Sequence, residues 1–180
     1  MESLKGKLLL SAGDLFDPNF RQTVVLLGEH DEAGAVGVVL NRPLDVTVAQ
    51  AVPVLSGLVG PDESLFQGGP VEPDQAVLLA EAASPDDLDV PVLGEVGFLT
   101  GDVPAAVRHG LRRARVYVGH SGWGPGQLEG ELAADSWIIA DATPDDIFTA
   151  EPGDLWRRIL KRLGPPHDAL ARIPFDPTMN

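Results

Sequence analysis

The chain reads Gly119-His120-Ser121-Gly122-Trp123-Gly124-Pro125-Gly126-Gln127-Leu128-Glu129 where an apolar run ends and a helical pattern begins. No other part of the chain crowds glycine, an aromatic ring, a hydroxyl and titratable groups together in this way. The four glycines let the backbone adopt positive φ angles or approach another surface closely. We therefore expect a loop here that is either a tight structural corner or a functional site.

Outward from this loop, short apolar and β-branched runs predict strands over residues 7–11, 23–29, 35–40, 64–67, 75–82, 115–119 and 136–140. Helical patterns cover residues 47–55, 102–111, 127–133 and 152–163, and Pro53 is expected to kink or end the first of them. Strands with interspersed helices and no internal repeat predict one mixed α/β or α+β domain.

The connections between these elements also carry local signals. Residues 30–34 predict a hairpin closed by Gly34, and residues 68–74 predict a joint rich in turns. Residues 84–90 are acidic and predict an exposed loop. Asp17-Pro18-Asn19-Phe20 predicts a single helical turn, and Thr143 followed by Pro144 predicts the start of a helix.

Composition excludes several classes of protein. With 180 residues and 44% hydrophobic content, the chain fits one domain with a single core. A net charge of -14 disfavours binding to phosphate backbones and anionic lipid surfaces. Cysteine is absent, which excludes disulfides, thiol nucleophiles and thiolate metal sites. Since the chain shows neither a signal peptide nor an apolar stretch of about 20 residues, we expect a cytoplasmic protein without membrane association.

A serine hydrolase is the first enzymatic interpretation of the glycine-rich stretch. Ser121 occupies the nucleophile position of a G-x-S-x-G elbow, and the candidate acids Asp141 and Asp145 and then His167 follow in the order acid, histidine. However, Trp123 stands where the last glycine belongs, and residues 124–126 delay the helix that should follow the serine directly. A structural corner is therefore the favoured interpretation, and hydrolysis through Ser121 is the alternative.

Nucleotide and metal chemistry find less support. Gln127 replaces the last glycine of a dinucleotide-binding loop, and Glu129 would repel a phosphate at the helix start. The four histidines lack metal-ligand spacing, and His30 is expected at an exposed hairpin end. We expect neither a metal nor a cofactor.

Eight of the basic residues form two clusters along the chain. Such clusters are more typical of helix ends and solvated helix faces than of a nucleic-acid surface. We therefore regard direct nucleic-acid binding as disfavoured. The clusters are Arg108, Arg112, Arg113 and Arg115, then Arg157, Arg158, Lys161 and Arg162.

Six motifs together resemble the AlgH-like family of bacterial proteins over about residues 5–164, leaving a C-terminal tail at 165–180. The resemblance implies a single domain over residues 1–180, with a curved, partly barrel-like mixed sheet surrounded by helices. The usual label of the family is transcriptional regulator, and no reaction comes with the resemblance. The motifs are Gly6-Lys7-Leu8-Leu9, Asp17-Pro18-Asn19-Phe20, Gly37-Val38-Val39-Leu40-Asn41-Arg42-Pro43, Gly68-Gly69-Pro70-Val71, residues 122–129 and Ser136-Trp137.

The motif positions supply seven candidates for binding a ligand or partner: Asn41, Arg42, Gly68, Gly69, Trp123, Gln127 and Glu129. We hypothesise that the three segments converge on one face, with Trp123 as a lid and an ion pair between Arg42 and Glu129. The leading function is then a non-catalytic binding or regulatory module for an unidentified protein partner or small ligand. The other possibility is that these loops only hold the sheet together by bonding to one another.

Overall fold

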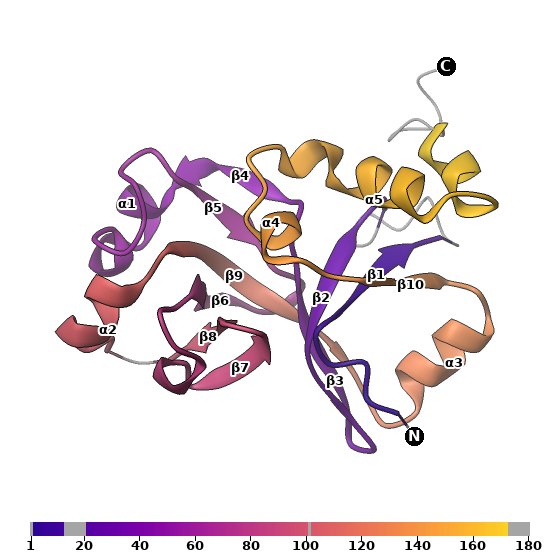
Figure 1. Cartoon of the computed structure of the whole chain (residues 1–180), viewed down its shortest axis with the longest axis horizontal. Helices are drawn as coiled ribbons and strands as arrows, with labels where there is room; N and C mark the ends of the chain where they lie inside the picture. The colour runs from indigo at the N-terminus through magenta and orange to yellow at the C-terminus, as the bar shows by residue number, and fades with distance from the viewer. Residues whose placement is uncertain (1, 13–20, 101, 173–180) are drawn as a thin grey trace.

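Ten strands form one open, largely antiparallel sheet in the computed structural model, which describes residues 2–12, 21–100 and 102–172 (Figure 1). The order is β10-β1-β2-β3-β9-β6-β8-β7, while β5 pairs with β4 and runs parallel to β9. The strands are β1 (Lys7–Ser11), β2 (Val24–Asp31), β3 (Gly34–Val39), β4 (Pro43–Thr47), β5 (Ser64–Gln67), β6 (Val71–Glu81), β7 (Val90–Leu93), β8 (Val96–Leu99), β9 (Arg113–Trp123) and β10 (Trp137–Asp141). The predicted α+β class is confirmed, and the sheet is not closed into a barrel.

Short helices lie around this sheet, and their caps follow from the sequence. Thr47 and Thr143 each form a capping box, with Gln50 and Asp146 respectively. Pro53 separates α1 from a following 3₁₀ turn, so the predicted helix over residues 47–55 is divided there. The helices are α1 (Val48–Ala51), α2 (Ala105–Gly110), α3 (Gln127–Ala133), α4 (Pro144–Ile147) and α5 (Leu155–Leu163), with 3₁₀ turns η1 (Pro53–Leu55), η2 (Pro85–Asp87), η3 (Pro152–Asp154) and η4 (His167–Arg172).

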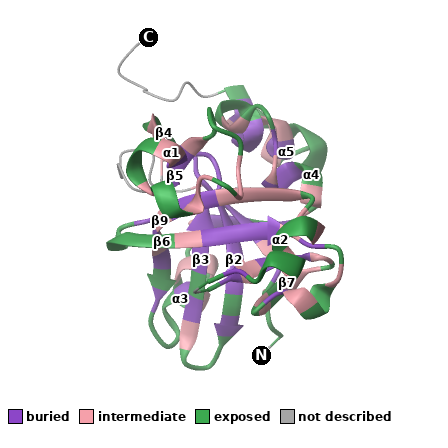
Figure 2. Cartoon of the chain, turned by 90° about the vertical axis from the view of Figure 1, so that its left-hand side faces the viewer, coloured by how far each residue is buried: buried purple, intermediate pink, exposed green. Residues whose placement is uncertain are grey.

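The long strand β9 joins the two halves of the sheet. It includes residues 119–123, for which we expected a loop. Trp123, Gly122 and Ser121 pair with residues 35–37 of β3, so this part of the stretch is strand. The strands β4, β7 and β8 were not predicted, and β6 begins within the predicted joint at residues 68–74. Figure 2 shows β6 exposed over its first half and buried over its second. The helical turn predicted at residues 17–20 lies outside the described residues.

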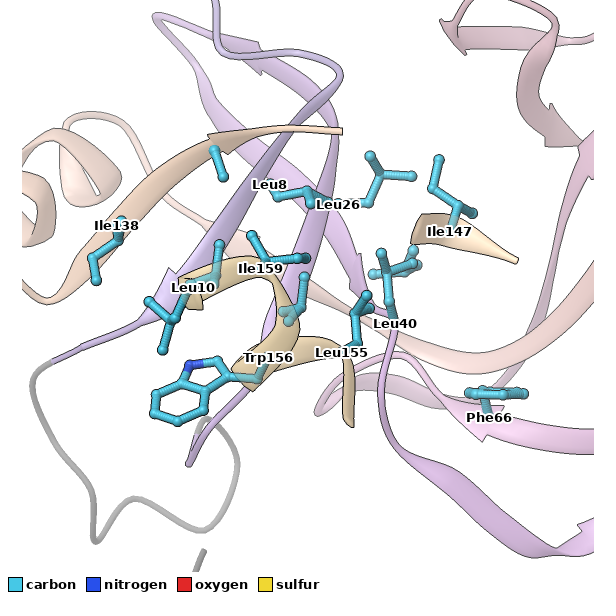
Figure 3. Packing of buried hydrophobic residues seen from close by; sticks show 14 of the residues in the cluster. Leu8, Leu10, Leu26, Leu40, Phe66, Ile138, Ile147, Leu155, Trp156 and Ile159 are labelled. Carbon is cyan, nitrogen blue, oxygen red and sulfur yellow. The ribbon is translucent and has the colours of Figure 1, made fainter. Parts of the chain in front are cut away.

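Both faces of β1 are covered, which explains its uninterrupted leucines. Leu8 and Leu10 pack in the same cluster as the residues of α5, whereas Leu9 packs with Leu128 of α3. Figure 3 shows Trp156 of α5 among the buried side chains of this cluster. Its indole N–H donates to the carbonyl of Ser11 at 3.1 Å. The helix predicted over residues 152–163 is found as η3 and α5, and the structure shows that its apolar stripe covers one face of the sheet. No helix in the described part of the chain is long and apolar enough to cross a membrane.

Candidate functional site

The turn between β9 and α3 is held by the carboxylate of Glu131. One of its oxygens, Oε1, accepts the indole N–H of Trp123 at 3.0 Å and that of Trp137 at 2.8 Å. The other, Oε2, accepts from Gln127 at 3.1 Å. Trp123 is only 6% exposed, and its ring meets Trp137 edge to face. The prediction of a tryptophan lid is therefore wrong, because this ring anchors α3 to the sheet.

Glu129 is bound by His30 on β2. The imidazole Nε2 lies 2.6 Å from a carboxylate oxygen of Glu129, while Nδ1 accepts the backbone N–H of Leu4 at 2.9 Å. Since Nδ1 accepts, Nε2 carries the hydrogen and donates it to Glu129. This hydrogen bond holds the pKa of Glu129 below its usual value. His30 is buried, so its predicted exposure is wrong. The predicted ion pair between Glu129 and Arg42 is also wrong, because Glu129 binds His30 while Arg42 donates to main-chain carbonyls.

Asn41 and Arg42 fasten the end of β3 to the start of β2. The side chain of Asn41 accepts the N–H of Val24 at 3.0 Å and donates to the carbonyl of Gln22 at 2.9 Å. Arg42 donates to the carbonyls of Arg21 and Asn41. Burial, followed by the charge of Arg21, lowers the pKa of Arg42 to about 10. Both motif residues therefore stabilise the local chain path.

Gly68 and Gly69 are glycines because β9 passes directly against them. A Cβ atom on Gly68 would lie 2.3 Å from the carbonyl oxygen of Gly119, and one on Gly69 would lie 2.2 Å from that of His120. Ser121 is fully buried beneath them, and its hydroxyl donates to the carbonyl of Gly68 at 3.2 Å. A nucleophile needs access to its substrate, so the hydrolase interpretation is not favoured.

The predicted convergence is correct for two of the three segments. Backbone hydrogen bonds link Val39 to Gly68 and Gln67 to Arg42, which brings the first two motifs together. Trp123 instead pairs with Ala35. Asn41 lies six residues beyond Ala35 in the sequence, which corresponds to roughly 20 Å at the usual rise of a strand. Gln127 therefore lies at the other end of β3, and whether any of the seven candidates binds a ligand stays a prediction.

A crevice beside His120 was not predicted. It has a volume of about 240 Å³, and residues of the β2–β3 hairpin and of the strands β6, β7, β8 and β9 line it. Most of its surface is apolar, and Glu29, Thr100 and His120 supply its polar side chains. The lining residues are Gly28, Glu29, Val36, Gly37, Val38, Val77, Val90, Phe98, Thr100 and His120.

Strand geometry explains why His120 lines this crevice while Ser121 does not. Successive side chains of a strand point to opposite faces, so the two residues face opposite sides of β9. If the predicted strand had been extended from residue 119 to residue 123, it would have placed His120 and Ser121 on opposite faces. The crevice opens onto apolar surface as well, since Val36 is 41% exposed and Val71 is 39% exposed. Val36 pairs with Gly122, and Val71 pairs with His120.

The arginines of the two basic clusters bind groups within the chain. Arg113 binds Glu81 and Asp145, and Arg162 binds both carboxylate oxygens of Asp146. Arg115 donates to the main-chain carbonyls of α4 and the segment after it. Arg113 and Arg115 lie on β9, so the expectation of a helix end is wrong for these two residues, whereas the second cluster lies on α5 as expected. In the described ranges, no group of three or more histidine, aspartate or glutamate side chains is arranged to hold a metal ion.

Comparison with known proteins adds a family to this geometry. The sequence profile described as AlgH-like matches residues 8–168. A UPF0301 protein of Streptomyces avermitilis is 37% identical over 100% of this chain and 97% of its own. A UPF0301 protein of Mycobacterium tuberculosis is 38% identical over 97% of this chain and 90% of its own.

Two solved structures are similar throughout their length. A crystal structure of a Corynebacterium diphtheriae protein has a TM-score of 0.85 and 25% identity, covering 95% of this chain and 93% of that one. The solution structure of the AlgH protein of Pseudomonas aeruginosa has a TM-score of 0.67 and 31% identity, covering 94% of both chains. These names describe a family rather than a reaction.

Proposed function

The chain belongs to the AlgH-like family, and from this premise we propose that it is a non-catalytic binding or regulatory module whose ligand site is the crevice beside His120. The occupant is a small apolar group, carried by a free ligand or by a side chain of a partner protein. The observation that supports this proposal most strongly is the exposure of Val36, which is 41% exposed although it lines the mainly apolar crevice. Exposed apolar surface beside a concavity is typical of binding sites.

The lining indicates the chemistry of the ligand. Valine and phenylalanine side chains favour a branched aliphatic or aromatic group, because burying apolar surface contributes about 25 cal/mol per Å². His120 and Glu29 can hydrogen-bond a polar head group at the same site. The carboxylate of Glu29 in the lining disfavours an anionic head at this site. We therefore expect a neutral or cationic ligand in this crevice.

The non-catalytic character is supported by the contacts of the reactive groups. The hydroxyl of Ser121 is buried on the opposite face of β9 from His120. Thr100 directs its hydroxyl to Asp89 at 3.2 Å, which occupies it structurally. A nucleophile with a base in hydrogen-bond reach is therefore not evident among the described residues that line the crevice.

The decisive experiment is a titration of the ¹⁵N-labelled protein with indole and with 3-methylbutanamide, followed by amide NMR spectra. We expect shifts confined to Val36, Val38 and His120 and their strand neighbours. Val36→Phe should fill the crevice and abolish these shifts. Val54→Phe is the matched control, because Val54 is 73% exposed on η1. Equal responses of the two variants, or shifts elsewhere in the sheet, would contradict the proposal.

A regulatory role through a partner is tested with the same pair of variants. A bacterial partner captured by the wild type and by Val54→Phe, but lost by Val36→Phe, would support docking at the crevice. Gel-shift assays over a range of salt concentrations separate this role from direct DNA binding, which would weaken steeply as salt rises. Salt-sensitive binding to DNA would contradict the proposal that the protein acts through a partner bound at the crevice.

A further inference from the structure

A second cavity lies over the first residues of β9, and it shares no lining residue with the crevice beside His120. Its volume is about 480 Å³, which suits a small molecule. Residues 57–60, which follow η1, form one wall, and Phe148 after α4 forms another. The lining residues are Gly57, Leu58, Val59, Gly60, Glu63, Arg112, Arg113, Ala114, Arg115 and Phe148.

Arg115 brings a half-buried positive charge to this cavity. Its guanidinium donates to the carbonyls of Ile147, at 3.1 Å, and Thr149, and lies 4.8 Å above the ring of Phe66. These acceptors are neutral, and within the described ranges no carboxylate forms an ion pair with Arg115. Burial lowers the pKa of Arg115 from its usual value. A guanidinium carries five N–H donors, so donors remain for a ligand.

Arg113, on the same face of β9, is held rigidly beside it. Its guanidinium binds both carboxylate oxygens of Glu81, at 3.0 and 3.2 Å, and Asp145 at 2.9 Å. It also lies 5.0 Å from the centre of the Phe148 ring. The charge of Arg113 is therefore matched within the protein, as is that of Arg112 by Glu95. Arg115 remains the cation that a bound anion would neutralise.

We propose that this cavity binds a small organic anion, whose carboxylate or phosphate group meets Arg115 and whose body packs against Leu58, Val59 and Phe148. Arginine forms strong, directional hydrogen bonds to both kinds of anion. Glu63 lines the same cavity and supplies a negative charge near Arg115. It competes with the ligand for this cation, so the affinity depends on Glu63 with a predictable sign.

Isothermal titration calorimetry with phenyl phosphate and with benzoate at low ionic strength tests the proposal and shows which anion is preferred. Removing the competing charge with Glu63→Gln should tighten binding by about tenfold, which corresponds to about 1.4 kcal/mol. Arg115→Gln should weaken it by at least about tenfold. Glu32→Gln is the control, because it removes the same charge from the exposed tip of the β2–β3 hairpin. It should leave the affinity near that of the wild type.

Three results would overturn the proposal. The first is the absence of binding of either anion by the wild-type protein. The second is an affinity of Glu63→Gln that equals that of Glu32→Gln or is weaker, since a ligand with a cationic group would need Glu63. The third is unchanged binding by a folded Arg115→Gln protein. If circular dichroism shows that Arg115→Gln is unfolded, the comparison of Glu63→Gln with Glu32→Gln decides whether the proposal holds.

Discussion

Trp123 donates its indole N–H to Glu131 at 3.0 Å across the turn that joins β9 to α3. The same carboxylate oxygen accepts the indole of Trp137, so one side chain satisfies two nearly buried donors. Buried indole N–H groups need an acceptor, and an ionised one makes a stronger hydrogen bond than a neutral one. The aromatic residue in the glycine-rich stretch therefore joins a helix to the sheet and does not cover a ligand.

Replacing this acceptor should destabilise the protein. We expect Glu131→Ala to lower the free energy of unfolding by about 2 to 4 kcal/mol, because two buried indole donors lose their partner. Urea denaturation followed by tryptophan fluorescence measures this change. Glu131→Gln retains an acceptor oxygen and should cost less. A loss no larger than that of the exposed control Glu32→Ala would contradict the role of Glu131 as an anchor.

Two glycines of similar appearance in the sequence should respond differently to alanine. At Gly69 a Cβ atom would overlap the carbonyl of His120, and φ is +151°. At Gly126, φ is +75°, but nothing lies within 4 Å of the added carbon. We expect Gly126→Ala to cost about 1 to 2 kcal/mol from backbone strain. Gly69→Ala should cost more than this or prevent folding, as thermal denaturation will show, and equal melting temperatures would contradict the close approach.

The pair of Asp146 and Arg162 should make stability depend on pH. Burial acts to raise the pKa of Asp146, but hydrogen bonds from Arg162 and Thr143 outweigh it and hold the pKa below its usual value. A lowered pKa in the folded state means that this stabilisation is complete above the unfolded pKa of about 3.9. It is lost as the pH falls through the folded pKa.

Asp146→Asn tests this dependence. The variant should be less stable than the wild type by about 1 to 2 kcal/mol at pH 7, since Arg162 is half exposed and solvent screens the pair. The difference should narrow below a pH of about 4. Denaturation curves at several pH values measure it, with Asp145→Asn, whose side chain is 92% exposed, as the comparison. A difference that stays constant down to pH 2 would show that the carboxylate charge is irrelevant.

Ser121→Ala separates a structural serine from a nucleophile. The carbonyl of Gly68 keeps its hydrogen bond from the N–H of Val39, so removing the hydroxyl should cost no more than about 1 kcal/mol. A fluorophosphonate probe should not label the wild-type protein, because Ser121 is fully buried. Labelling of the wild type that disappears in Ser121→Ala would restore the hydrolase interpretation.

The local elements could be predicted where neighbouring residues carry the cause. The threonine cap at Thr143 and the apolar stripe of α5 depend on residues within a few positions, and both are found in the structure. The strand at residues 90–93 escaped prediction because its residues are only partly buried and Pro91 interrupts the pattern. The sequence of residues 119–123 predicts a loop, although they form a strand, because glycine suits a turn and a closely packed strand alike.

The sequence by itself determined the α+β class, most helices and strands, and membership in a family through motifs in a common order. Only the tertiary structure decided what the motif residues contact. Glu129 meets His30 and Glu131 meets two tryptophans because α3 packs against the face of the sheet that extends from β10 to β9. The crevice beside His120 and the cavity beside Arg115 arise in the same way. Each is formed by side chains that are distant along the chain. The sequence did not predict them because the pairing of distant strands cannot be recognised in the local pattern of residues.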